Sequence, residues 1–191
     1  MHSIPETSQY FVRVCRLHPS VGRAKLRLAM TIREIKPDVD CDSLLAGAQF
    51  ADAFRVTVAD AGLDARAAAE RMFSRNPRWV QSLLNLRNAI VAPFGLKTSG
   101  TNDARNRGVI GLFPVLSETP QRLVAGFNDH HLDFRVVVDV LPAGGGREVT
   151  ATTLVLTHNW FGRIYLAAIM PFHRMIAKTL LKQVCQVPAS H

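Results

Sequence analysis

Two histidines and a carboxylate are spaced so that a pair of neighbouring strands could bring them together. His131, Asp133 and Arg135 alternate along one predicted strand and therefore share one of its faces. His158 and Asn159 close the next predicted strand. An imidazole oriented by a carboxylate is suited to general-base catalysis, and imidazoles with a carboxylate also bind divalent metal ions. Because neither His-x-His nor His-Glu-x-x-His spacing is present, we expect no metal site.

A solvated network is the alternative interpretation of this strand face. Polar faces of antiparallel strands commonly meet water, and Asp133 would then pair with Arg135 or with a neighbouring strand. Such an exposed ion pair contributes only about 0 to 1 kcal/mol to stability. Because polar strand faces in antiparallel sheets usually meet solvent, a solvated network is favoured over a catalytic site on this face.

Arg87 interrupts the apolar stripe of a predicted helix. It lies three or four residues from Leu83, Leu84, Ile90 and Val91. A buried arginine needs an anionic partner, which is either a ligand carboxylate or phosphate held by two hydrogen bonds, or a fixed aspartate. Alternatively, the aliphatic stem is buried while the guanidinium reaches water. The binding and the structural interpretations both stay open.

Three further candidates lie on a predicted C-terminal helix. Arg163 either binds an anion beside the His158 and Asn159 corner or is a solvated charge. Tyr165 falls within the apolar stripe, where its hydroxyl needs a partner in a ligand or in a backbone carbonyl. His173 is expected to be a structural histidine. The sequence has no Gly-x-Ser-x-Gly motif and no phosphate-binding loop, and we expect no cofactor.

The composition is that of a globular chain whose charge is unevenly distributed. The 191 residues are 48% hydrophobic and carry a formal net charge of +8. Residues 1–29 hold five basic side chains against Glu6 alone, and the other charges are interspersed along the chain. Because no basic stripe interleaves with stacking aromatic residues, we expect no nucleic-acid binding.

The sequence predicts a cytoplasmic protein without a membrane span. The longest uninterrupted apolar stretch, residues 164–172, has nine residues and includes Pro171, whereas a bilayer span needs about 20. The N-terminus lacks the apolar segment of a secretory signal. Three cysteines, Cys15, Cys41 and Cys185, have no Cys-x-x-Cys spacing and are expected to be free thiols.

The hydrophobic pattern predicts strands and helices in a defined order within one domain, residues 30–191. Residues 1–29 form a basic extension that is either disordered or precedes a true start at Met30. The predicted strands are residues 48–58, 109–116, 121–127, 130–141 and 147–158, and the predicted helices are residues 64–73, 76–91 and 160–186. Residues 97–108 are polar and are expected to form a loop beside the binding site.

The last two strands are predicted to form a hairpin closed by residues 142–146. Symmetric pairing sets Val140 opposite Val149 and Leu132 opposite Thr157, which makes one face almost wholly apolar. The final helix is expected to cover that face and to bend, or to divide in two, at Pro171. Its expected inner side consists of Phe161, Ile164, Tyr165, Ala168, Phe172, Met175, Ile176 and Leu180.

Four short motifs resemble the bacterial domain of unknown function family 2867. They are His131-Leu132-Asp133-Phe134-Arg135, Thr157-His158-Asn159, Gly162-Arg163-x-Tyr165 and Pro171-Phe172-His173-Arg174. The resemblance covers about residues 48–182. It implies an α+β fold of the START-like, SRPBCC-type helix-grip class. In that class an antiparallel sheet wraps around a long C-terminal helix, and two shorter helices follow the first strand.

The resemblance also implies a cavity for a small hydrophobic molecule, but it implies no reaction and no cofactor. Our leading hypothesis is that this chain binds such a molecule through an anionic group, using Arg87 or the cluster of His131, Arg135 and His158. One alternative is an isomerase, cyclase or hydrolase in which His131 or His158 is the base and Asp133 orients it. A second alternative is an interaction module that pairs through a sheet edge or the last helix. The sequence indicates no oligomeric state.

Overall fold

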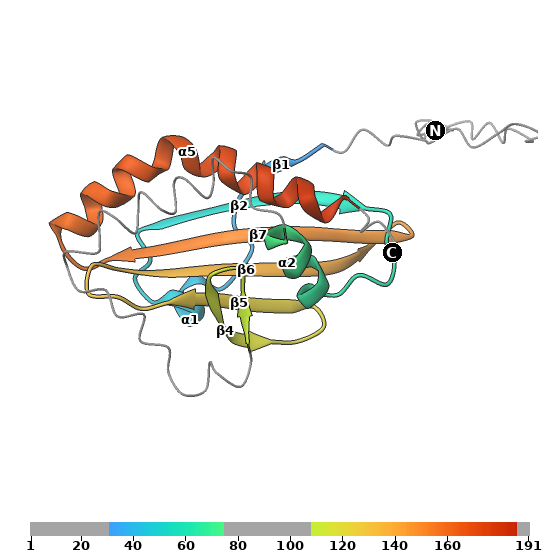
Figure 1. Cartoon of the computed structure of the whole chain (residues 1–191), viewed down its shortest axis with the longest axis horizontal. Coiled ribbons are helices and arrows are strands. Elements are labelled where there is room, and N and C mark those ends of the chain that lie inside the picture. Colours follow the sequence, from blue (N-terminus) through green and yellow to red (C-terminus); the bar gives the residue numbers. More distant parts are fainter. Residues whose placement is uncertain (1–30, 75–107, 187–191) are drawn as a thin grey trace, which may run out of the picture.

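The computed structural model describes residues 31–74 and 108–186, in which a long helix and two short ones pack on one antiparallel sheet (Figure 1). Within these ranges the sheet has seven strands in the order β1-β2-β7-β6-β5-β4-β3. The strands are β1 (Arg33–Ile35), β2 (Phe50–Val58), β3 (Val109–Ile110), β4 (Phe113–Glu118), β5 (Arg122–Phe127), β6 (Leu132–Ala143) and β7 (Gly146–Thr157). The helices are α1 (Cys41–Leu45), α2 (Ala65–Phe73) and α5 (Trp160–Val184). The chain therefore has the predicted α+β class.

The hairpin of β6 and β7 forms in the predicted register. Val140 lies opposite Val149 and Leu132 opposite Thr157, and the backbone N–H of His158 donates to His131 O at 2.9 Å. At the turn the strands reach Ala143 and Gly146, closer together than predicted, because only Gly144 and Gly145 form the turn. Their φ angles of +52° and +88° suit a two-residue hairpin turn, which requires positive φ at both central positions. At the other end the strands stop one or two residues short of the predicted bounds.

One face of the sheet packs against α2 and α5 and forms the main core. Val136, Val138 and Val140 of β6 are buried there against α2 and against Leu181 of α5. Figure 1 shows α5 extending along the sheet, with α2 lying over the central strands. Alternation along β6 and β7 places these apolar side chains on one face, so burying them requires helices on that side.

The inner side of α5 differs from the predicted one. Ile164, Ala168, Phe172 and Met175 are exposed, although the sequence placed them against the sheet. The side chains that do face the sheet include Tyr165, Leu166, Ile169, His173, Ile176 and Leu180. The prediction holds for Tyr165, Ile176 and Leu180 and was wrong for the four exposed residues. Because α5 carries apolar residues on both sides, helical spacing alone could not choose between them.

α5 is a single helix that contains Pro171, and its ribbon changes direction near the middle (Figure 1). A proline inside a helix removes one backbone hydrogen bond and bends the axis. By length and composition α5 could also cross a membrane, although the core helix of a soluble protein meets the same criteria. The expectation that the chain has no membrane span stays a prediction.

The opposite face of the sheet is also covered, in contrast to the solvated face that the sequence favoured. Val137, Thr152 and Leu154 point to this face and are completely buried. Helix α1 lies on this side, where Leu45 is buried. Both faces of the central strands therefore belong to the protein interior.

Several predicted segments lie outside the described residues. These are the N-terminal extension, the helix at 76–91 with Arg87, and the loop at 97–108 apart from its last residue.

Helix α2 begins where it was predicted, because the side chain of Asp64 accepts a hydrogen bond from Ala67 N at 2.7 Å. Strand β1 and helix α1 were not anticipated.

Ion pairs attach α2 to its surroundings. Arg66 donates from Nε to Glu118 of β4 at 2.7 Å, and Arg71 lies 2.8 Å from Asp60. The hydrogen bond from Arg66 lowers the pKa of Glu118, and that from Arg71 lowers the pKa of Asp60. Carboxylates with a lowered pKa stabilise the folded state above their ordinary pKa and lose that contribution as the pH falls below it.

This linkage predicts a pH-dependent effect of replacing Arg66. The melting temperature of Arg66→Met should lie below that of the wild type at pH 7, and the difference should shrink once the pH falls below about 4.5, the ordinary pKa of Glu118. Arg163→Met is the control, because it removes the same charge from an exposed arginine of α5. A difference in melting temperature that stays constant from pH 7 to pH 3 would show that the ion pair contributes nothing.

Candidate functional site

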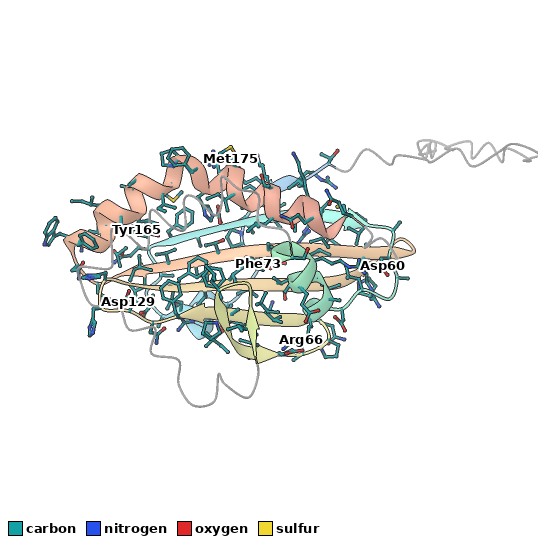
Figure 2. The ribbon with its side chains drawn as sticks, viewed as in Figure 1. Asp60, Arg66, Phe73, Asp129, Tyr165 and Met175 are labelled. Atoms are coloured by element: carbon teal, nitrogen blue, oxygen red, sulfur yellow. The ribbon has the colours of Figure 1, made fainter. Side chains whose placement is uncertain are left out.

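A pocket lies between the sheet and the middle of α5. Its volume is about 190 Å³, and its walls are mostly apolar. Phe50 of β2, Phe134 of β6 and Val155 of β7 line it from the sheet. From α5, Tyr165 and His173 reach it, and Figure 2 shows Tyr165 on α5, above the strands. The polar side chains on the wall are Thr153, Tyr165 and His173, which is the pattern of a small-molecule site: an apolar pocket with few polar groups.

His173 is paired with a carboxylate at this wall. Its Nε2 lies 3.1 Å from Oδ1 of Asp52 and 2.9 Å from Oδ2, and the two side chains are only 15% and 11% exposed. An ionised carboxylate only accepts hydrogen bonds, so Nε2 carries the proton. Asp52 thereby fixes the orientation of the imidazole. No hydrogen bond from the described residues is made to His173 Nδ1.

The position of Asp52 follows from the alternation of β2. Phe50, Asp52 and Phe54 point to the face that α5 covers, and Asp52 lies opposite Thr153 of β7. Oδ2 of Asp52 is buried and has no hydrogen bond among the described residues, although it lies 2.9 Å from Nε2 of His173 in the ion pair. A buried carboxylate oxygen in that state costs free energy unless a further donor is supplied.

Sequence reasoning missed Asp52, and it named His173 as a candidate while expecting a structural role for it. The signal for Asp52 was its position, because it replaces an apolar residue in the series Phe50, Phe54, Val56 of the core-facing side. An acidic residue in such a series must be paired or functional. The partner, His173, lies 121 residues away, so no local spacing connects the two.

The predicted pair of His158 and Asp133 does form, but away from the pocket. His158 Nε2 lies 3.1 Å from Asp133 Oδ1, at the end of the hairpin where α5 begins. Asp133 Oδ1 also accepts from Asp129 N at 3.1 Å. Neither residue lines the pocket. The proposed catalytic pair therefore lies at the strand ends, and its imidazole is 38% exposed.

The neighbouring candidates also hold the chain together at this end. Asn159 caps α5, because its Oδ1 accepts from Gly162 N at 2.9 Å. Its Nδ2 lies 2.9 Å from His131 Nδ1. Arg135 donates to Phe127 O at 3.0 Å, Phe134 O at 2.9 Å and Asn128 Oδ1 at 2.6 Å. Burial lowers the pKa of Arg135, and its donors are used on the protein itself.

The predicted ligand-binding cluster of His131, Asp133, Arg135, His158 and Asn159 is therefore not at the pocket. Arg163 is exposed on α5, and Arg87 lies outside the described residues. Of the predicted candidates, the pocket brings together Tyr165 and His173. Within the described ranges, no group of three or more His, Cys, Asp or Glu side chains could hold a metal ion.

A family model described as "Protein of unknown function (DUF2867)" matches residues 44–180. The chain belongs to this family. The match agrees with the resemblance seen in the four sequence motifs, and it includes β2, the hairpin and most of α5. Both members of the Asp52 and His173 pair thus lie within the DUF2867 region.

Other comparisons add little to the DUF2867 assignment. No curated protein matches the chain. A solved structure, "Crystal Structure of Protein Ms6760 from Mycobacterium smegmatis", is 12% identical and has a TM-score of 0.26. The match covers 80% of this chain and 95% of that one. A similarity this low supports no argument about fold or function.

Proposed function

We propose that the protein binds a small, mainly apolar molecule in the pocket beneath α5, with the molecule's polar group held at His173. The observation that carries the proposal is His173, which lies on the wall of a mostly apolar pocket and is held by the carboxylate of Asp52. Stability alone does not account for such a pair, because replacing a buried ion pair with apolar residues of similar volume is often neutral or stabilising. Its presence at a pocket therefore favours recognition of a ligand.

The pocket volume restricts the size of the ligand. About 190 Å³ is less than the roughly 300 Å³ at which typical ligand pockets begin. Engineered cavities of about 150 Å³ are large enough to hold benzene. We therefore infer a ligand with one substituted ring, or an aliphatic molecule of similar volume.

The polar end of the ligand is expected to meet the imidazole. Because Nε2 of His173 is occupied by Asp52, Nδ1 is the nitrogen left for a ligand. A neutral imidazole would accept a hydrogen bond from a hydroxyl or N–H group, and a protonated one would donate to an anion.

We also assign the fold to the helix-grip, START-like class, which the single sheet covered by a long C-terminal helix supports.

Native mass spectrometry of the protein purified from its own host tests the proposal. We expect a co-purifying molecule that contains about one ring. If none is retained, indole, phenol and benzoate serve as probes, and at least one should raise the melting temperature of the protein by mass action. A protein that retains no molecule and responds to none of the three probes would contradict the proposal.

Filling the pocket should remove binding at little cost in stability. In Val155→Phe the added ring points into the void, so we expect a melting temperature close to that of the wild type and no response to the probes. Val138→Phe is the matched control, because Val138 is fully buried on the same sheet face and does not line the pocket. Overpacking there should cost about 1 to 3 kcal/mol. Equal destabilisation of the two variants would argue against a real void.

A second candidate function is catalysis with His173 as a general base. The specific observation is that Asp52 orients the imidazole at a pocket with mostly apolar walls. The ligand identified by mass spectrometry, incubated with the protein in D₂O, would then acquire deuterium on carbon. His173→Gln should abolish that exchange, and a ligand that gains no deuterium would leave binding as the function.

A further inference from the structure

The outer side of α5 carries a continuous apolar stripe. Trp160, Ile164 and Met175 are 71%, 58% and 50% exposed, and Figure 2 shows Met175 on the side of α5 away from the sheet. Phe172 and the small residues Ala167, Ala168 and Pro171 fill the gaps between them. The stripe spans four turns of helix, which makes it a coherent surface rather than scattered apolar residues.

Basic residues accompany this stripe, and α5 contains no acidic residue. Arg163 and Arg174 are exposed next to Ile164 and Met175, and Lys182 is exposed further along the helix. The nearest acidic partner in the described ranges is Glu34 of β1, whose carboxylate lies 3.1 Å from Arg174. That pair is exposed and therefore weak, so both arginines can interact with an external anion.

We propose that the outer side of α5 docks onto an anionic lipid surface, with the helix lying in the interface. An apolar stripe with tryptophan and phenylalanine, bordered by arginine and lysine, is the composition of helices that bind in the plane of a membrane. The apolar side chains enter the boundary between headgroups and acyl chains, and the arginines meet the lipid phosphates.

Charge repulsion disfavours a second copy of this chain as the partner of the α5 stripe, compared with an anionic lipid surface. Pairing two α5 stripes would bring Arg163 and Arg174 of one copy close to the same residues of the other, with no carboxylate on α5 to compensate. An anionic surface offers the opposite charge along the whole helix. Spanning the bilayer is also disfavoured, because it would expose the pair of His173 and Asp52 and strip α5 from the sheet core.

Sedimentation with vesicles tests the proposal on the full chain. We expect binding to phosphatidylcholine vesicles that contain phosphatidylglycerol, little binding to pure phosphatidylcholine, and release by high salt. In a Trp79→Phe variant, which keeps Trp160 as the single tryptophan, the emission should shift to shorter wavelength on binding. Residues 1–29 are basic too, so they are kept in every variant.

Three glutamine variants separate the contributions. Ile164→Gln with Met175→Gln removes apolar contact, and Arg163→Gln with Arg174→Gln removes charge; each double variant should weaken vesicle binding at least tenfold. Leu141→Gln is the control for exposed apolar surface, because Leu141 is 49% exposed on the far face of β6. It should bind as the wild type does. All variants should keep the wild-type melting temperature, since they alter exposed side chains.

Three results would overturn the proposal. The first is no binding to anionic vesicles, and the second is wild-type binding by both α5 variants, which would assign the attraction to the rest of the chain. The third is a wild-type dimer in light scattering that becomes a monomer in Ile164→Gln with Met175→Gln, which would identify a second copy as the occupant. These results are independent of whether the pocket holds a ligand.

Discussion

Replacing Gly162 with alanine should destabilise the protein, although alanine is the better helix former by about 1 kcal/mol. A Cβ atom at Gly162 would lie 2.1 Å from the carbonyl oxygen of His131, which is backbone and cannot rotate away. The first turn of α5 would have to move off the hairpin, and the cap from Asn159 to Gly162 N would weaken. We expect a loss of at least about 2 kcal/mol, or a fall in melting temperature of roughly 4 to 8 °C.

Gly62→Ala provides the matched comparison. A Cβ atom there meets its nearest neighbour, Asp60 Oδ1, at 3.7 Å, which is an ordinary contact. That variant should therefore change the melting temperature by a degree or two at most, by reducing the freedom of the unfolded chain. Thermal unfolding followed by circular dichroism measures both. A Gly162→Ala variant as stable as the wild type would mean that α5 does not start as close to His131 as the structure places it.

The hairpin was predictable because its two faces differ in composition. Val136, Val138 and Val140 share an almost wholly apolar face, whereas Arg135, Asp139 and other polar residues lie on the opposite one, so a slip by one position would have mixed the faces. The two glycines at the turn then set the point of closure. The apolar pattern and the turn glycines both indicate the same register, so the register could be predicted from the sequence.

The orientation of α5 was not predictable from its own sequence. Ile164 and Met175 are as apolar as Ile169 and Ile176, yet the first two face outward and the last two face the sheet. A helix with one apolar side reveals its buried face, whereas a helix with two does not. The proposal that α5 binds a membrane surface rests on the apolar stripe that faces away from the sheet.

The site itself was half predictable. His173 and Tyr165 were named as candidates. The predicted catalytic pair was instead His158 and Asp133, because these two residues are close in the predicted hairpin. The pair that reaches the pocket joins β2 to α5, and such a long-range contact is visible only once the helix is placed on the sheet. Local spacing identifies sites within one supersecondary unit, and this site spans two.

The pair of Asp52 and His173 should show a large, non-additive effect on stability. In His173→Leu the carboxylate of Asp52 stays in an apolar environment without its partner, and in Asp52→Leu the imidazole loses its acceptor. Breaking a largely buried pair in this way should cost about 2 to 4 kcal/mol in each single variant. The double variant, in which both groups are apolar, should lie within about 1 kcal/mol of the wild type, since no unpaired polar group remains.

Urea unfolding of the three variants gives the coupling free energy between Asp52 and His173. Probe binding shows how much ligand affinity each variant loses. If the pair exists for recognition, the double variant regains stability but no longer responds to phenol or benzoate. Additive losses in the double variant would mean that Asp52 and His173 do not interact. A stable double variant that still bound the probes would mean that the pair plays no part in recognition. A double variant that is as stable as the wild type but no longer binds the probes would assign the pair to recognition, because folding stability would not require it.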